Sequence, residues 1–163
     1  IAALSGPAHG GAAANVMHMA KEIGDASKAA AYVKAKRGNK EPVMGFGHRV
    51  YKHGDHRAQI LEVELRKLAV SKNQQVWMDI YDAIKDPMVN EKRIFPNVDY
   101  PCGLTYYLLG LPLDLYTPLC GASRVTGWSA HFIEQAANNR IYRPLSKYVG
   151  PASHSVAPID NRG

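Results

Sequence analysis

Hydrophobic residues recur along the chain at steps of three and four positions, the spacing of one face of an α-helix. The first such stretch covers residues 12–23, is rich in Ala and Met, and is followed by Gly24, a residue typical of helix ends. A second helix is expected after Asp25 or Ser27, because either side chain can cap a helix. The basic residues and glycine at positions 36–38 are typical of its C-terminus.

Two amphipathic helices are predicted in the middle of the chain, after a loop at about residues 39–54. The first begins near His56, and four aliphatic residues share one of its faces: Ile60, Leu61, Leu65 and Leu68. The second follows Asn73, and three residues form its apolar face: Val76, Ile80 and Ile84. We expect both faces to be buried, and we expect residues 87–96 to form a loop.

The last part of the chain combines two predicted helices with an extended tail. Asp99 followed by Pro101 indicates the start of a short helix, since proline is tolerated in the first helical turn, and Gly110 ends this helix. The longest apolar-periodic stretch covers residues 117–137. From Arg143 onwards three prolines predict an extended arm. Without alternation of strands and helices or an internal repeat, the fold class is all-α.

The amino-acid composition indicates the sign of the protein's net charge and the cellular compartment. The 163 residues are 46% hydrophobic and 21% charged, which suits one globular domain with a core. A net charge of +6 favours an anionic ligand but also permits non-specific attraction to nucleic acid. Cys102 and Cys120 are too few for a disulfide framework and lack zinc-site spacing, so they indicate a reducing compartment, which we interpret as the cytoplasm.

Neither a membrane span nor a signal peptide is predicted. The most apolar stretch, residues 104–120, is interrupted by glycine, prolines and Asp114, whereas a span needs about 18–20 uninterrupted apolar residues. The chain opens on Ile1 rather than on Met, and we expect it to be the later part of a longer protein.

Two glycine-containing segments between the helices could carry chemistry. His9 stands just before a helix N-terminus, whose N–H groups favour a neutral ring able to donate a hydrogen bond to an oxyanion; a histidine in a tight turn is the alternative. Residues 43–52 place a glycine loop beside His48, and the cationic residues around it suit a polyanionic substrate. This loop has no third glycine and no preceding strand, which disfavours a dinucleotide fingerprint.

Two further candidates are charged residues at helices. Asp99 either caps a helix or takes part in the reaction. Arg124 lies among apolar residues, where it needs a partner: a substrate carboxylate or a structural Asp or Glu. His53 and His56 could be half of a metal site, but no other ligand stands at a convincing spacing. We therefore predict no metal site.

Together, four ordered motifs resemble the citrate synthase family over essentially the whole chain. They are SGPAHGG at residues 5–11, MGFGHRVYK at 44–52, FPNVD at 95–99, and SRVTGW at 123–128 with Arg143 and Pro144. The second motif is similar to the bacterial and archaeal branch, and the sequences near the C-terminus, VGP at 149–151 and PID at 158–160, strengthen the similarity.

The resemblance implies an all-α, citrate synthase-like subunit with a large and a small domain, which dimerises to complete each active site. Residues 1–100 would form the small domain, residues 101–143 would supply helices returning to the large domain, and residues 144–163 would form an extended C-terminal arm. The implied activity is condensation of acetyl-CoA with oxaloacetate to give citrate and CoA. No permanent cofactor is implied, since acetyl-CoA and CoA are substrate and product.

The resemblance also implies residue roles. Asp99 would be the base that removes a proton from the methyl group of acetyl-CoA, and His9 would stabilise the resulting enol. His48 would bind and polarise the ketone of oxaloacetate. Three arginines would bind the carboxylates of oxaloacetate: Arg57, Arg124 and Arg143, the last reaching the site of the neighbouring subunit. The backbone of one loop would hold the CoA adenine: Val43, Met44, Gly45, Phe46 and Gly47.

Two departures from the family pattern leave the acyl preference open. His56 stands where the family usually has Pro, and Pro101 and Cys102 stand where it usually has Tyr and Ser. One alternative is therefore 2-methylcitrate synthase acting on propionyl-CoA, because one methylene changes binding by only about 1–3 kcal/mol. Further alternatives are a citryl-CoA lyase-type module and a non-catalytic helical fragment. The resemblance places another oxaloacetate-binding histidine upstream of Ile1.

Overall fold

Helices make up the regular structure of the computed structural model, which describes residue 4, residues 11–150 and residues 155–162. Within this part there is no β-strand, and Phe46 and Pro96 form an isolated bridge. The all-α fold predicted from the sequence is therefore confirmed. The chain divides into two units, Ile1–Thr126 and Gly127–Gly163.

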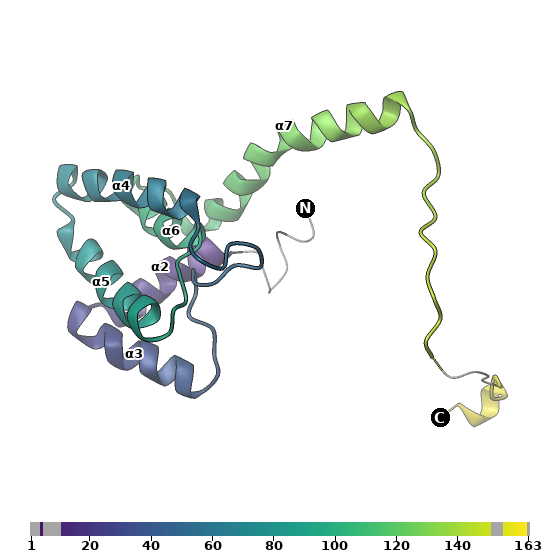
Figure 1. Cartoon of the computed structure of the whole chain (residues 1–163), viewed down its shortest axis with the longest axis horizontal. Helices are drawn as coiled ribbons and strands as arrows, with labels where there is room; N and C mark the ends of the chain where they lie inside the picture. Colours follow the sequence, from purple (N-terminus) through teal and green to yellow (C-terminus); the bar gives the residue numbers. More distant parts are fainter. Residues whose placement is uncertain (1–3, 5–10, 151–154, 163) are drawn as a thin grey trace. The chain divides into compact units, whose positions relative to one another are not determined.

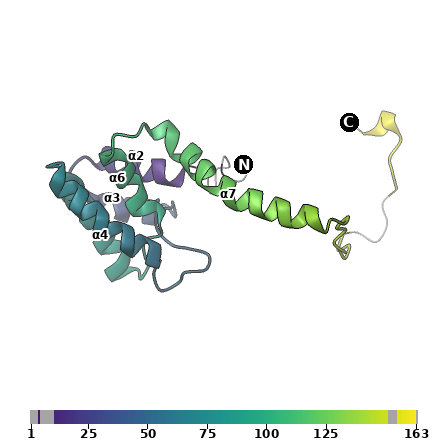
Figure 2. The ribbon, with the colours of Figure 1, turned by 90° about the horizontal axis from the view of Figure 1, so that it is seen from above.

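The first unit contains α2 to α6 and the start of α7 (Figures 1 and 2). Its elements in chain order are α2 (Ala12–Ile23), α3 (Ala26–Gly38), α4 (His56–Ser71), α5 (Gln75–Asp86), the π-helix η1 (Pro87–Glu91), α6 (Asp99–Leu108), the 3₁₀ turn η2 (Leu113–Leu115) and α7 (Tyr116–Ala137). Helix α2 packs on α6 and α3 packs on α5, while α4 lies against both α5 and α6.

Local sequence determines where the first helices begin and end. Gly24 adopts the left-handed conformation, with φ of 66°, and its N–H donates to the carbonyl of Ala20, which closes α2. Asp25 is the residue that caps α3, because its carboxylate accepts from the backbone N–H of Ser27 at 2.8 Å. The predicted bounds of both helices are thus confirmed.

Two expectations were wrong. Residues 87–91 are not loop but a π-helix, because Pro87 has no N–H to continue the α-helical bonding while the buried side chain of Met88 holds the segment against the core. Ile60 and Val76 are not buried: their exposed fractions are 57% and 53%. The buried side of α4 is narrower than predicted, being formed by Ala58, Leu65 and Ala69.

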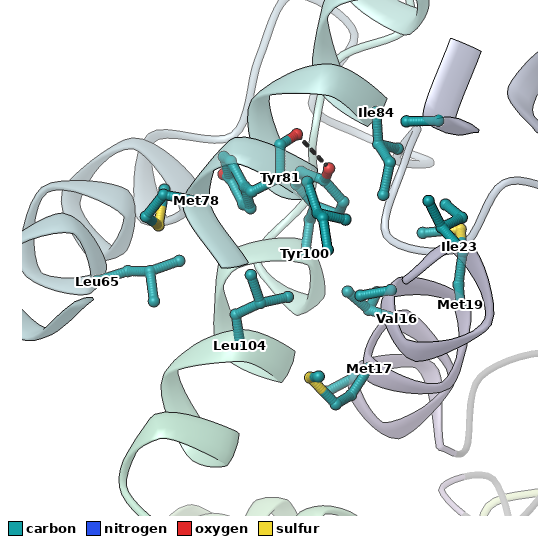
Figure 3. Close-up of a cluster of buried hydrophobic side chains, with 14 of the residues drawn as sticks. Val16, Met17, Met19, Ile23, Leu65, Met78, Tyr81, Ile84, Tyr100 and Leu104 are labelled. Atoms are coloured by element: carbon teal, nitrogen blue, oxygen red, sulfur yellow. Dashed lines mark hydrogen bonds between the residues drawn. The ribbon is translucent and has the colours of Figure 1, made fainter. Parts of the chain in front are cut away.

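The core of the first unit lies where α2, α4, α5 and α6 meet. Figure 3 labels these core residues: Val16, Met17, Met19, Ile23, Leu65, Met78, Tyr81, Ile84, Tyr100 and Leu104. The rings of Tyr81 and Tyr100 are stacked with centroids 4.3 Å apart, and the Tyr100 hydroxyl donates to the Tyr81 carbonyl at 2.7 Å. This contact ties α6 to α5.

Two glycines permit close packing around the start of α6. A Cβ at Gly103 would lie 2.5 Å from the carbonyl oxygen of Ala13, so α6 and α2 approach too closely for a side chain there. A Cβ at Gly45 would lie 2.8 Å from Tyr100 and from Val16, and Gly45 also has a φ of +82°. The loop that contains Gly45 is thereby packed onto both helices.

The second unit contains the C-terminal part of α7, followed by residues 139–149 without regular secondary structure and by the 3₁₀ turn η3 (Ile159–Asn161). Among the described helices, none combines the length and the apolar character required to cross a membrane.

Candidate active site

Most of the predicted site residues line one cavity of about 730 Å³ in the first unit. They come from the loop before α4 and from the starts of α4, α6 and α7: Val43, Met44, Gly45, Phe46, Gly47, His48, Arg57, Asp99 and Arg124. His9 lies outside the described residues, so its predicted role stays a prediction. Arg143 belongs to the second unit, where it is exposed, and its role stays a prediction as well.

The glycine loop is held beside the start of α6 by hydrogen bonds between two distant segments. The N–H of Gly47 donates to the carbonyl of Phe95 at 2.8 Å, and the N–H of Asn97 donates to the carbonyl of Gly45 at 2.9 Å. The side-chain amide of Asn97 also donates to the carbonyl of Gly47 at 2.9 Å. These bonds bring His48, at the end of the loop, to the same cavity as Asp99.

The backbone of the loop determines the tautomer of His48. Its Nδ1 atom accepts hydrogen bonds from the N–H groups of Val50 and Tyr51, both at 3.0 Å. A ring nitrogen that accepts carries no proton, so in the neutral ring the proton is on Nε2. His48 can therefore donate one hydrogen bond through Nε2, as a group that polarises a ketone must.

Asp99 lies in the first turn of α6 and does not cap it. The cap position belongs to Val98, and instead the side-chain oxygen of Asn97 accepts from the N–H of Asp99 at 3.0 Å. The alternative that Asp99 serves as a helix cap was therefore wrong. A carboxylate in the first turn also lies at the positive end of the helix dipole, which stabilises its negative charge.

The guanidinium group of Arg57 is oriented by Asp55 and Tyr51. Its Nε and Nη2 atoms donate to the two carboxylate oxygens of Asp55 at 3.0 and 2.8 Å. Its central carbon lies 5.2 Å from the ring centroid of Tyr51, which in turn stacks on His48 with centroids 4.6 Å apart. Tyr51 thus stands between the two groups predicted to bind the keto acid.

The surroundings of Arg57 favour its positively charged form. Hydrogen bonding to Asp55 raises the pKa of Arg57, and the nearby charge of Asp99 acts in the same direction. The same contact lowers the pKa of Asp55 below its ordinary value. Arg57 is therefore a fixed cation, and its Nη1 atom is not used by Asp55.

Arg124 lines the cavity from α7, but its side chain is exposed in this chain. The neighbouring residues of α7 are exposed as well. The expectation that Arg124 pairs with a substrate carboxylate or with a structural Asp or Glu stays a prediction. Arg124 and Asp99 also line a second, smaller cavity of about 40 Å³ beside the N-terminus of α2. Both residues therefore line a cavity together with the start of α2, at Gly11 and Ala12.

One side of the large cavity is formed by sulfur and aromatic groups. Cys102 and Tyr106 follow Asp99 on α6 at steps of three and four, so they share its face, and Cys120 contributes from α7. Burial raises the pKa of Cys102 to about 11, which keeps the thiol protonated near neutral pH. The part of the cavity next to the Asp99 carboxylate is thus lined by uncharged side chains of α6.

A sequence model of the citrate synthase C-terminal domain matches residues 1–145. The chain belongs to the citrate synthase family. Its citrate synthase fold is also seen in a solved structure, that of the citrate synthase of Thermoplasma acidophilum in a ternary complex with carboxymethyl coenzyme A and oxaloacetate. That chain is 41% identical, with a TM-score of 0.84, and the match covers 99% of this chain and 44% of the other.

Two relatives within the citrate synthase family are equally similar but carry different names. The 2-methylcitrate synthase 2 of Corynebacterium glutamicum is 48% identical over 99% of this chain, and a citrate synthase of Mycolicibacterium smegmatis is 48% identical over 96%. The chain spans 42% of the length of either relative.

Three residues of this candidate site were given no role of their own in the sequence analysis: Asp55, Tyr51 and Asn97. Asp55 carried one signal, since an Asp directly before a helix is typical of a cap. The contacts of Tyr51 and Asn97 join segments far apart in the chain, and no local pattern indicates them.

Proposed function

We propose that this chain supplies the C-terminal part of the active site of an enzyme that condenses acetyl-CoA with oxaloacetate. The observation that carries this proposal is the single cavity that gathers a hydrogen-bond donor at His48, a carboxylate at Asp99 and cations at Arg57 and Arg124. A condensation on a keto acid with two carboxylates needs these three kinds of group.

In the proposed reaction Asp99 removes a proton from the carbon next to the thioester carbonyl. The electron pair released on that carbon forms the new bond to the ketone carbon of oxaloacetate, and the π pair of the ketone moves onto its oxygen, which accepts a hydrogen bond from Nε2 of His48. That oxygen takes up a proton from solvent to become a hydroxyl group, which balances the proton that Asp99 removes and later returns to solvent. His9 stabilises the enol oxygen, as the family resemblance implies. Water then cleaves the thioester, which releases citrate and CoA.

The substrates bind to two different parts of the cavity. Arg57 and Arg124 take the carboxylates of oxaloacetate, since a planar guanidinium can make two parallel hydrogen bonds to a carboxylate. The backbone of residues 43–47 holds the adenine of CoA, which is bound as part of the substrate and not as a permanent cofactor. Support for this role comes from the lining of the cavity, to which all five residues of this loop contribute.

A second candidate is 2-methylcitrate synthase, which uses propionyl-CoA. The equal identity of this chain to relatives of both names favours neither substrate. The uncharged side of the cavity at Cys102, Tyr106 and Cys120 lies next to Asp99, where the acyl group must be held, so these residues are candidates for the difference.

The test is a thiol-release assay on the product of the complete reading frame, with acetyl-CoA and propionyl-CoA in parallel. We expect release of CoA that depends on oxaloacetate, and the larger kcat/KM identifies the physiological acyl donor. If neither thioester is consumed in the presence of oxaloacetate, the proposed function is wrong.

We further propose that the enzyme is a cytoplasmic homodimer, in which Arg143 reaches the partner's site. In this proposal residues 1–100 belong to the small domain, residues 101–143 to the large domain, and residues 144–163 form the arm. Support comes from the exposed apolar residues of the second unit, among them Phe132, Ile133 and Leu145, which need a surface to cover them. Light scattering of the whole protein should give twice the chain mass.

A further inference from the structure

Asp55 is the charged side chain that the described part of the structure buries most completely, with an exposed fraction of 2%. It precedes α4 and accepts four hydrogen bonds. Three come from the N–H, Nε and Nη2 of Arg57, at 3.1, 3.0 and 2.8 Å. The fourth comes from the backbone N–H of Val98, at 3.1 Å. A buried carboxylate with this many donors is held in one orientation.

The bonds to Arg57 fix the direction of its guanidinium group. The carboxylate of Asp55 takes Nε with one oxygen and Nη2 with the other, so the planar group is held at two points. Its far edge, with Nη1, stays available to a ligand, and more than half of the Arg57 side chain is exposed. A substrate carboxylate can therefore meet an arginine that is already in place.

The bond to Val98 reaches the other half of the site. Val98 directly precedes Asp99, and it stands 43 positions from Asp55 in the sequence. Through this bond the start of α4, which carries Arg57, is tied to the start of α6, which carries Asp99. A shift of either helix start would stretch a hydrogen bond to the same carboxylate.

We propose that Asp55 is a positioning residue that sets the orientation of Arg57 and the location of Asp99 together. The inference rests on the proposed function, in which Arg57 binds oxaloacetate and Asp99 acts on the acyl-CoA. Holding two reactants at reacting distance is a major part of catalysis, and one buried carboxylate bonded to both sides serves that end.

An amide cannot replace this carboxylate. All four partners of Asp55 are donors, whereas Asn offers one acceptor oxygen and one NH₂ group, which would face a second donor. The side chain of Asp55 stays ionised because the hydrogen bonds from Arg57 lower the pKa of Asp55. Asp55→Asn therefore removes the positioning while leaving the size of the side chain nearly unchanged.

The chain provides a matched control in Asp25. This aspartate caps α3 as Asp55 caps α4, accepting the N–H of the residue two positions later at 2.8 Å, but it is exposed and is not part of the cavity lining. Asp25→Asn thus reports the exchange of a carboxylate for an amide at a helix cap alone, since Asn also caps helices. Asp55→Ser is the second variant, since serine retains a cap acceptor but cannot hold the guanidinium group.

The experiment compares these variants in the product of the complete reading frame. We expect Asp55→Asn and Asp55→Ser to raise the KM for oxaloacetate and to lower kcat, each by about 10-fold or more, the range seen when an outer partner of a site residue is lost. Asp25→Asn should change neither. Exchange of the acetyl-CoA methyl protons with solvent deuterium, which measures proton abstraction, should slow in the Asp55 variants.

A double-mutant cycle with Arg57→Lys separates positioning from folding. If Asp55 acts on oxaloacetate through Arg57, the KM effects of the two substitutions will be much less than multiplicative in the double variant. An active wild type whose Asp55→Asn variant behaves like Asp25→Asn, or effects that multiply fully, would overturn the inference and leave the proposed function standing. An inactive wild type would instead refute the proposed function.

Discussion

At the residue scale, the site depends on which atoms are already bonded within the protein. Nδ1 of His48 is held by two backbone N–H groups, and Nε and Nη2 of Arg57 are held by Asp55. The atoms left over, Nε2 and Nη1, are donors on the cavity side of groups that cannot turn freely. Pre-oriented donors stabilise developing charge without reorganising during the reaction.

His48→Ala should lower kcat by roughly 10²–10³, because it removes the donor that polarises the ketone. The thiol-release assay measures this effect with oxaloacetate and the preferred acyl-CoA. His53 is the matched control: it lies in the same loop region, is exposed and is not part of the cavity lining. Equal activities of His48→Ala and His53→Ala would refute the assignment.

The buried carboxylate of Asp55 should make stability depend on pH in a known direction. Its pKa in the folded chain is lowered from 3.8, chiefly by the hydrogen bond from Arg57. Its contribution is therefore present above the unfolded pKa and is lost as the pH falls through the folded pKa. Urea denaturation should show wild type more stable than Asp55→Asn at about pH 7, with the gap narrowing below about pH 4.

A gap that widens as the pH falls would contradict this direction. The measured quantity is the difference in unfolding free energy between wild type and Asp55→Asn. Other carboxylates titrate in the same pH range, but their contributions are the same in both proteins and cancel in this difference.

The sequence predicted residues that act through their own motif and missed those that act through contacts. His48, Asp99 and Arg57 were recognised from short motifs, and the cavity brings all three together. Asp55 and Asn97 were given no role, because they act through bonds to Val98 and to the carbonyl of Gly47, on segments that only the fold brings near.

At the element scale, the contact between α2 and α6 is the tightest constraint on the site. The carbonyl oxygen of Ala13 would lie 2.5 Å from a Cβ at Gly103, and the same region of α2 packs against Gly45 through Val16. Helix bounds were predictable, since caps and glycines are local signals, as at Asp25 and Gly24. The π-helix and the exposure of Ile60 were not, because they depend on which face finds a partner.

Gly103→Ala should destabilise the chain by about 1–3 kcal/mol, the usual cost of forcing extra volume into a packed contact. Gly121→Ala is the control, because Gly121 also lies in a helix but has no atom within 4 Å of its added Cβ. It should be neutral or stabilising, since alanine favours helix by about 1 kcal/mol over glycine. Urea unfolding of both variants measures the difference, and equal stabilities would contradict the packing argument.

At the scale of the whole molecule, the chain contains much of a site but spans 42% of the length of the relatives it matches. We therefore expect residues 1–163 alone to be inactive, because a partial cleft cannot hold two substrates at reacting distance. Exposed apolar residues such as Phe132 and Ile133 should also make the isolated chain self-associate. Light scattering and the condensation assay test both points; a monomer with enzymatic turnover would contradict them.

The thiols at the cavity allow ligand binding to be measured by alkylation. The 163 residues include two cysteines, Cys102 and Cys120, and both line the large cavity. Because burial raises the pKa of Cys102 to about 11, alkylation should be slow near neutral pH and should accelerate as the pH rises. A CoA thioester bound in the cavity should slow it further, so the mass added to the intact protein by iodoacetamide reports ligand binding without any turnover.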